Sequence, residues 1–283
     1  SYLSPNGDTV QDAAKLDFKV TLRVKSKEGY VPTYGLRVKK GDAIVRDVQA
    51  PGEKSDIGWF MRLFTGYTEF TLQRSLEWEG KDDDQKVVSD GTYEGAVYVI
   101  DASNNQTEIK VGDFVVDNTA PQATASAESL FFSPNGDGHK DALQIRQGGS
   151  SEDLWTGTIV DAAGKVVRTF TWKSSAPADQ LWDGKTDAGA AAPDGSYNYI
   201  LESTDRAGNK ARIEALKNIV LDTRPTPVRI AIEPAYFSPN GDKVQDTVTF
   251  KLTTDIKDGI VGWRLAVTDA ARRQVWVRDE KTD

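Results

Sequence analysis

The sequence has no cysteine, one histidine and one methionine among its 283 residues. The absence of cysteine excludes disulfide bonds and thiolate chemistry. With His139 as the only imidazole, Cys–His and Ser–His–Asp catalytic groups lack parts. No apolar run approaches the ~20 residues that a membrane helix needs, and no glycine-rich phosphate loop leads into a helix. These absences argue against an enzyme and against membrane insertion by this segment.

The charge balance is acidic, with 43 Asp and Glu residues against 35 Lys and Arg residues and a net charge of -8. Nucleic-acid binding depends on neutralising phosphates with Lys and Arg, so an acidic chain is a poor candidate for it. We therefore expect a protein or cell-surface partner, whose identity the sequence does not give, and no nucleic acid.

The chain is rich in internal repeats. Ser-Pro-Asn-Gly-Asp begins at residues 4, 133 and 238, and Trp-x-Gly-Lys and Asp-Gly-x-Tyr follow the first two copies in step. Repeats at such spacing indicate a modular array. We expect module 1 at residues 1–120, with a truncated first strand and an insertion at about 49–71; module 2 at 121–225; and module 3 at 226–283, holding only the first half of the repeat. We interpret the chain as a piece of a longer array.

Alternating apolar and polar residues predict strands throughout, as in Leu16 to Val24 and Val248 to Leu252. No segment has a helical period. In module 2 the pattern predicts seven strands, at about 122–131, 142–148, 154–160, 165–172, 179–183, 196–204 and 210–221. The expected fold class is all-β, as tandem seven-stranded Ig-like or fibronectin III-like β-sandwiches. A Greek-key barrel is the alternative.

The motif order SPNGDGHKD, WDGKTDAG, PDGSYNY, DRAGN and VLDTRP in module 2 resembles the Ig-like domain family of the bacterial flagellar hook-capping protein. Related repeats occur in large bacterial surface and secreted proteins. The resemblance covers all of module 2, both ends of module 1 and the first half of module 3. It implies a structural or binding module of Ig-like fold and does not specify a ligand.

The SPNGD motif has two interpretations. Proline, glycine, asparagine and aspartate are the residues of tight turns, so the three copies could be one repeated turn. That interpretation does not explain why another aspartate follows four residues later each time. Calcium takes six to eight oxygen ligands, which suggests a Ca²⁺ site built from Asn6, Asp8, Asp12, Asn135, Asp137, Asp141, Asn240, Asp242 and Asp246.

Strand order predicts where further ligands would lie. In a seven-stranded sandwich with alternating strand directions, the first turn, the turn between strands five and six, and the exit of the last strand share one pole. This places Asp117 and Asp222 beside the SPNGD loops as additions at the junction with the next module. The turn between strands five and six adds Asp83 and Asp90 in module 1, and Asp187 and Asp194 in module 2. His139 is expected to be solvated, and the repeated tryptophans to form the cores.

The insertion of module 1 is the candidate for a private binding surface. Its apolar residues are Trp59, Phe60, Met61, Leu63, Phe64 and Tyr67. A large exposed apolar patch marks a partner site. The alternative is that the insertion folds back and covers its own sandwich.

The sequence thus predicts a non-catalytic structural or adhesion segment of a larger bacterial surface or exported protein, located outside the cytoplasm and stiffened by calcium at its SPNGD loops. One alternative is an ancillary spacer of an exported enzyme whose catalytic domain lies elsewhere. Another is an assembly scaffold in a flagellar or envelope structure.

Overall fold

The computed structural model describes residues 1–24, 33–50, 68–100, 103–255 and 260–281. These residues form strands and turns, so the expected all-β class is confirmed. The contacts divide the chain into two compact units, Ser1–Asp222 and Thr223–Asp283. Within the described ranges, no helix has the length and apolar character needed to cross a membrane.

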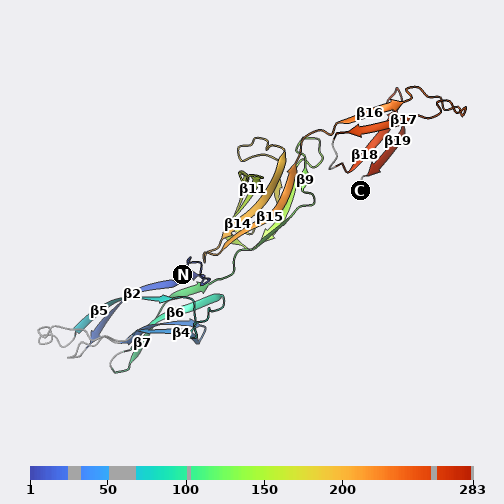
Figure 1. Cartoon of the computed structure of the whole chain (residues 1–283). Coiled ribbons are helices and arrows are strands. Elements are labelled where there is room, and N and C mark those ends of the chain that lie inside the picture. Colours follow the sequence, from blue (N-terminus) through green and yellow to red (C-terminus); the bar gives the residue numbers. More distant parts are fainter. Residues whose placement is uncertain (25–32, 51–67, 101–102, 256–259, 282–283) are drawn as a thin grey trace. The chain divides into compact units, whose positions relative to one another are not determined.

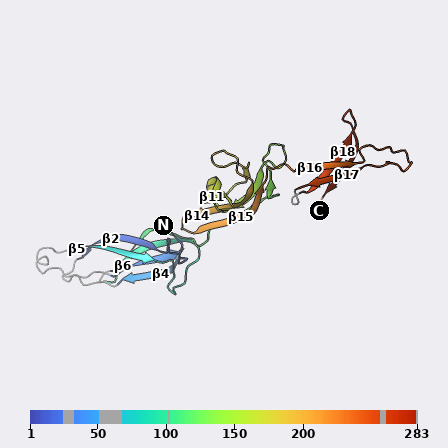
Figure 2. The same cartoon turned by 45° about the horizontal axis from the view of Figure 1, so that its top comes forward.

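Module 2 is a sandwich of two sheets. Antiparallel pairing joins β11, β14 and β15 side by side, and β9 adds to β15 in parallel (Figures 1 and 2). The sheets have the strand orders β12-β11-β14-β15-β9 and β13-β10-β8. The strands are β8 (Ala123–Ser126), β9 (Phe131–Phe132), β10 (Leu143–Gly149), β11 (Glu152–Asp161), β12 (Val166–Ser175), β13 (Gln180–Trp182), β14 (Gly195–Thr204) and β15 (Lys210–Leu221).

Six of the seven predicted strands of module 2 occur near their expected bounds, and the first is divided in two. Its beginning, β8, pairs antiparallel with β10 in one sheet, whereas its end, β9, pairs parallel with β15 in the other. The hydroxyl of Ser129 accepts a hydrogen bond from the Phe131 N–H at 3.2 Å where the chain changes sheets. Serine can break a strand in this way because its hydroxyl competes for backbone groups.

The core of module 2 lies wholly within the module. Its fully buried cluster runs from Phe132 to Leu221 and takes residues from both sheets, including Leu143, Trp155 and Trp182. The indole N–H groups are satisfied, since Trp155 donates to Ser150 O at 2.9 Å and Trp182 to Lys185 O at 3.0 Å. Because no other module contributes to this cluster, we expect module 2 to fold on its own.

Module 1 repeats this topology. Its sheet β1-β7-β6-β3-β4 corresponds to β9-β15-β14-β11-β12, and its pair β2–β5 corresponds to β10–β13. Trp78 is 1% exposed, as Trp182 is, so the expectation that the repeated tryptophans form cores is confirmed for both. The strands are β1 (Tyr2–Leu3), β2 (Ala14–Val24), β3 (Thr33–Lys40), β4 (Ala43–Ala50), β5 (Thr68–Trp78), β6 (Gly91–Ile100) and β7 (Gln106–Val116).

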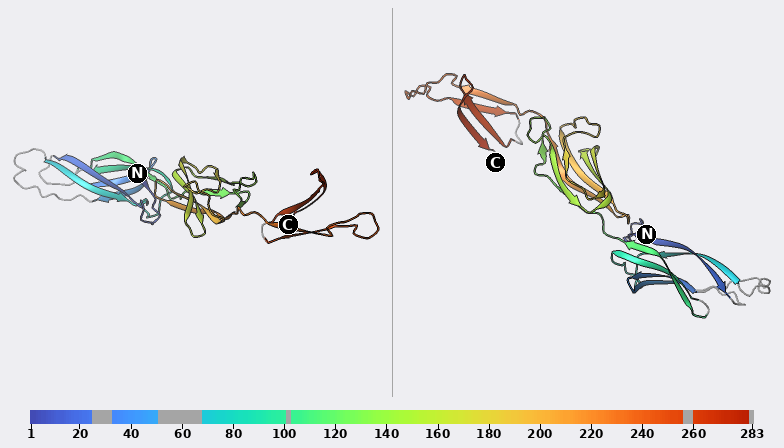
Figure 3. Two further views of the ribbon diagram at one scale, coloured as in Figure 1. Left: turned by 90° about the horizontal axis from the view of Figure 1, so that it is seen from above. Right: turned by 180° about the vertical axis from the view of Figure 1, so that it is seen from behind.

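Module 3 consists of two antiparallel strand pairs, drawn in orange to red in Figure 3. The pair β16–β17 corresponds to β8–β10, and the pair β18–β19 corresponds to β11–β12. Trp263 on β18, the counterpart of Trp155, is half-buried here. The strands are β16 (Val228–Glu233), β17 (Thr249–Thr254), β18 (Gly262–Thr268) and β19 (Gln274–Lys281).

Candidate intermodule interface

The three SPNGD loops have the same backbone hydrogen bonds. In the first loop the Ser4 N–H donates to Gln11 O at 2.9 Å and the Asn6 N–H to Ser4 O at 2.7 Å. The second and third loops repeat both bonds at 2.8 Å. Gly7, Gly136 and Gly241 all have φ between 81° and 84°, a region that other residues rarely adopt. The motif is therefore one turn structure used three times.

The structure explains the aspartate that follows each motif. Asp12 Oδ1 accepts the Gly7 N–H at 2.8 Å, and Asp12 Oδ2 accepts the Thr9 N–H at 2.7 Å. Asp141 and Asp246 accept the equivalent pairs of N–H groups at 2.8–2.9 Å. The turn therefore needs this carboxylate, because it satisfies two backbone donors that a tight loop leaves unpaired.

The predicted calcium ligands also bond to the loop backbone. Asn6 Oδ1 accepts the Asp8 N–H at 2.9 Å, Asp8 Oδ1 accepts the Val10 N–H at 2.8 Å, and the other loops repeat this pattern. Among the described residues, no three His, Cys, Asp or Glu side chains are grouped so that they could hold a metal ion. A loop supplies two carboxylates and an amide, fewer than the six to eight oxygens of a calcium shell. Calcium binding at these loops stays a prediction.

The expected common pole exists in both complete sandwiches. A Cβ added to Gly184, in the turn after β13, would lie 2.6 Å from Pro134 Cγ and 3.2 Å from Leu221 Cδ1. Asp117 and Asp222 lie at this pole, since their N–H groups donate to Leu3 O at 3.0 Å and Phe132 O at 3.2 Å.

Two aspartates of the fifth turn bond to edge-strand backbone. Asp187 Oδ1 accepts the Thr169 N–H at 3.0 Å, and Asp83 Oδ1 accepts the Asp47 N–H at 3.1 Å. These bonds fasten the fifth turn to the edge strands β12 and β4. Their place beside the SPNGD residues as calcium ligands stays a prediction.

The first SPNGD loop docks on the turn between β14 and β15, residues 205–209. Ser4 Oγ donates to Asn209 Oδ1 at 2.5 Å, and Asn6 Nδ2 donates to the same oxygen at 3.1 Å. Asn209 Nδ2 in turn donates to Asp117 O at 2.8 Å. Ser4 is fully buried and Asn209 is 3% exposed. The asparagine therefore joins module 2 to both the start and the end of module 1.

Hydrogen bonds within module 2 hold this turn in shape independently of module 1. Asp205 Oδ1 accepts the N–H groups of Ala207 and Asn209, both at 2.9 Å, and Asp205 Oδ2 accepts Asn209 Nδ2 at 2.8 Å. Gly208 has φ 92°, which favours glycine. The Asn209 side chain is thus oriented by its own module before it meets Ser4.

Two further residues of the first loop contact the turn. A Cβ on Gly208 would lie 2.7 Å from Val10 Cγ1, so the valine packs directly against the glycine. With its amide oriented to satisfy both ends, Gln11 donates to Arg206 O and Ala207 O, both at 2.9 Å. Val10 and Gln11 therefore contact the backbone of the turn, and a side chain at position 208 would prevent Val10 from packing there.

Arg206 forms the rim of the interface. Its guanidinium lies 6.0 Å from the centre of the Tyr2 ring and forms an ion pair with Asp153 at 2.7 Å. The hydrogen bonds that Arg206 donates to Asp153 and Tyr2 raise the pKa of its guanidinium. The pair is exposed, so it orients the side chain more than it stabilises the fold.

Carboxylates beside the interface are affected by burial. Burial raises the pKa of Asp117, and the negative charges of Asp205 and Asp90 raise it further. Burial would also raise the pKa of Asp90, but hydrogen bonds from Thr119 and Asn118 lower it overall. Asp90 Oδ2 accepts the Thr119 hydroxyl at 2.7 Å and so ties the segment after β7 to module 1.

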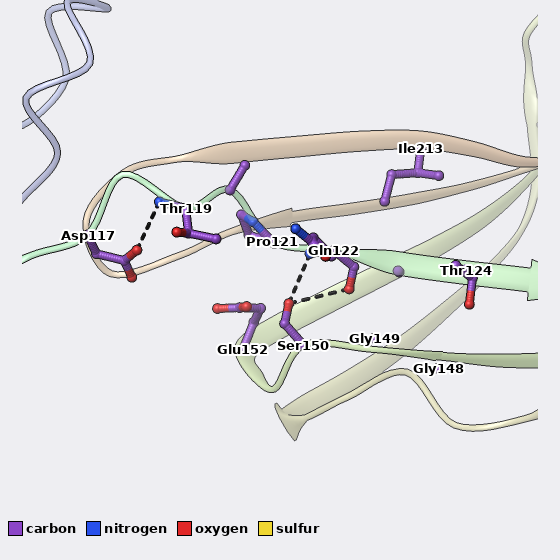
Figure 4. A pocket seen from close by; sticks show the side chains of 12 residues that line it. Asp117, Thr119, Pro121, Gln122, Thr124, Gly148, Gly149, Ser150, Glu152 and Ile213 are labelled. Carbon is purple, nitrogen blue, oxygen red and sulfur yellow. Dashed lines mark hydrogen bonds between the residues drawn. The ribbon is translucent and has the colours of Figure 1, made fainter. Parts of the chain in front are cut away.

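A groove follows this connecting segment (Figure 4). Its walls include Thr119, Pro121, Gln122, Ser150, Glu152 and Ile213. Gln122 N–H donates to Ser150 Oγ at 3.0 Å, which closes the start of module 2 onto the β10–β11 turn. The dashed lines in Figure 4 mark this bond, the bond from Ser150 Oγ to Gln122 O, and the bond from the Thr119 N–H to Asp117.

The proposed partner surface, Trp59, Phe60, Met61, Leu63, Phe64 and Tyr67, lies outside the described residues. His139 is exposed at the second loop, where Val10 stands in the first.

The sequence pattern did not identify the 205–209 turn as a binding element. A signal was present, because Val10 and Gln11 recur as Val244 and Gln245, whereas the second loop has His139 and Lys140.

One protein-family model matches the chain. It is described as the CHU_C type IX secretion signal domain, and it matches residues 127–215, which lie within module 2. The predicted resemblance to the hook-capping family is not confirmed. No curated protein sequence matches the chain.

The chain also resembles solved structures at low identity. A tetra-tandem repeat from the extending region of a large adhesion protein is 15% identical, covers 99% of this chain and 62% of its own, and gives a TM-score of 0.32. A Ca²⁺-stabilised adhesin of an Antarctic bacterium that binds ice is 14% identical, with coverages of 82% and 49% and a TM-score of 0.35. The fibronectin(III)-like modules of Clostridium thermocellum CbhA are 13% identical, with coverages of 78% and 86% and a TM-score of 0.29. The chain thus spans less than two thirds of the first two structures.

Proposed function

We propose that this chain is a non-catalytic segment of a bacterial exported or surface protein, in which SPNGD loops couple successive Ig-like modules. The observation that carries the proposal is the buried hydrogen bond from Ser4 to Asn209, supported by Asn6, Val10 and Gln11 around it. Such a coupling would restrict bending between modules, which suits a segment that holds other domains at a distance.

The geometry supports this role for a physical reason. Separating the modules would expose Ser4 and Asn209 to water and replace three side-chain hydrogen bonds with bonds to water. Each such bond contributes about 1 kcal/mol net to holding the modules together. The contact also depends on shape, since Val10 fits only against a glycine. Calcium, where it binds, would add to these direct bonds.

Export is the second part of the proposal, and the match of residues 127–215 to a type IX secretion signal domain supports it. It is tested by fusing module 2 to a reporter in a bacterium that has this secretion route. We expect the reporter outside the cell, and its retention inside would contradict export through this module. The external partner that an adhesive role requires would be sought with the whole protein.

The coupling is tested by whether modules 1 and 2 reorient together in solution. Residual dipolar couplings of the full chain should fit one alignment tensor for both modules, and two tensors after Asn209→Ala. Lys165→Ala is the matched control, because Lys165 holds the place of Asn209 in the similar turn between β11 and β12, where Asp161 accepts its N–H at 2.9 Å. Independent modules in the wild type, or no change in the Asn209→Ala variant, would contradict the coupling.

A further inference from the structure

We infer that the third loop, residues 236–246, is a docking surface for a further Ig-like module that carries an Asp-x-Ala-Gly-Asn turn. The inference rests on the proposed coupling and extends it to a partner outside these 283 residues. Module 3 would bind this turn through the same hydrogen bonds and packing by which the first loop of module 1 contacts residues 205–209.

The third loop repeats every side chain with which the first loop contacts its turn. Tyr2, Ser4, Asn6, Val10 and Gln11 recur as Tyr236, Ser238, Asn240, Val244 and Gln245. The second loop keeps only the serine and the asparagine of this set, and has Phe131, His139 and Lys140 at the other places. The shared turn structure does not require Tyr, Val and Gln, since the second loop makes the same backbone bonds without them. Their recurrence therefore points to a shared partner.

The third loop has the geometry of an undocked loop. Asn240 Nδ2 donates to Asp242 Oδ2 at 3.0 Å, as Asn135 does to Asp137 in the second loop at 3.1 Å. In the docked first loop, Asn6 Nδ2 instead donates to Asn209. Docking of the third loop would thus require only that the Asn240 amide turn from its own aspartate to the partner asparagine.

The apolar residues of the third loop are exposed. Tyr236 is exposed, and Val244 is 65% exposed whereas Val10, which packs against Gly208, is half-buried. The exposed tyrosine and valine, together with the neighbouring hydrogen-bond donors, form a surface that is partly apolar and partly polar. The partner turn supplies what this surface lacks, namely an asparagine oxygen, two free carbonyls and a glycine.

The turns of this chain are poor occupants of the third loop. The 205–209 turn is already covered by the first loop of the same unit, so a second copy could offer it only by giving up that contact. The corresponding turn of module 1 has Asn104 where Gly208 stands, and its Cβ would meet the valine. A further module with glycine at this place is therefore the occupant that fits.

The test uses the full chain and the isolated module 2, residues 121–225, as a probe. Removing module 1 uncovers the 205–209 turn of the probe, and the probe has its own complete core. Titration of the probe into isotope-labelled full chain should give saturable amide shifts in residues 236–246. Ser238→Ala in the chain or Asn209→Ala in the probe should weaken binding about tenfold, since each removes a partner of a hydrogen bond that docking buries.

His139→Ala in the full chain is the matched control and should leave the affinity unchanged. Absence of shifts at up to about 1 mM probe, a regime that still detects millimolar binding, would overturn the inference. Shifts confined to residues 2–12 would also overturn it, because they would mean exchange at the first loop. If the dipolar couplings show modules 1 and 2 joined through Asn209 but the probe does not bind, the proposed function stands and this inference alone fails.

Discussion

Ser4 and Asn209 are 205 residues apart in the sequence and share a hydrogen bond of 2.5 Å that is closed to solvent on both sides. Asn209 Oδ1 accepts a second bond from Asn6, and its Nδ2 group bonds to Asp117 O and Asp205 Oδ2. Every polar atom of this amide is therefore occupied, and four residues from two modules depend on it.

Removing the serine hydroxyl should destabilise the joined modules. Ser4→Ala is expected to lower the free energy of unfolding by about 1–2 kcal/mol, because it weakens the satisfaction of a buried acceptor. Ser133→Ala, the same residue in the second loop, should change it by less than about 0.5 kcal/mol. Denaturant unfolding of the full chain, followed by tryptophan fluorescence, measures both, and equal effects would argue against a special role for Ser4.

A side chain at position 208 should disturb both the turn and the interface. Gly208→Ala places a Cβ 2.7 Å from Val10 Cγ1 at a residue with φ 92°. We expect a loss of about 2–3 kcal/mol, of which backbone strain accounts for about 1 kcal/mol.

Gly164→Ala isolates the strain, since Gly164 has φ 80° with no atom within 4 Å of its added Cβ. Calorimetry of Gly208→Ala alone and combined with Val10→Ala separates the two effects. Failure of the smaller residue at position 10 to recover any stability would show that the clash is not with Val10.

The second loop provides the test for calcium. In chelator, the double variant Asp137→Ala with Asp141→Ala should melt below the wild type, because backbone N–H groups lose their acceptors. Calcium bound to the native loop would raise the melting temperature by mass action, and the double variant would lack this rise. Identical melting temperatures of the wild type with calcium and with chelator would mean that these carboxylates only accept backbone hydrogen bonds and do not bind calcium.

The interface should respond to pH through Asp117. Its pKa is raised in the folded protein from the ordinary 3.8, so the ionised carboxyl destabilises the fold. This cost is complete above the folded pKa and disappears as the pH falls towards 3.8. Asp117→Asn keeps the acceptor for the Thr119 N–H and should raise the melting temperature at pH 7 by about 1–3 °C. The gain should vanish below pH ~3.8, and a gain that is independent of pH would contradict this explanation.

Much of the fold could be predicted from the sequence, because period-2 patterning depends only on which face of a strand is buried. The division of the first strand of module 2 could not, since residues 122–131 alternate without a glycine or proline and a serine makes the break. The pole of the SPNGD loops followed from counting strand directions, and Leu221 and Pro134 confirm it. The interface itself was missed because Asn209 is an ordinary turn residue until Ser4, from another module, meets it.

Gly208 leaves room for Val10 of the first SPNGD loop because it has no side chain. At the corresponding place in module 1, the Cβ of Asn104 would occupy that room. The SPNGD loop and the turn on which it docks belong to different sandwiches, so neither sandwich alone contains both sides of this interface, or joint. Recombination that exchanged whole sandwiches would break such joints at both ends. Because the loop lies near the start of module 1 and the turn near the end of module 2, a cut through the middle of either sandwich would also separate them, so the smallest inherited unit that keeps the joint is the two modules together.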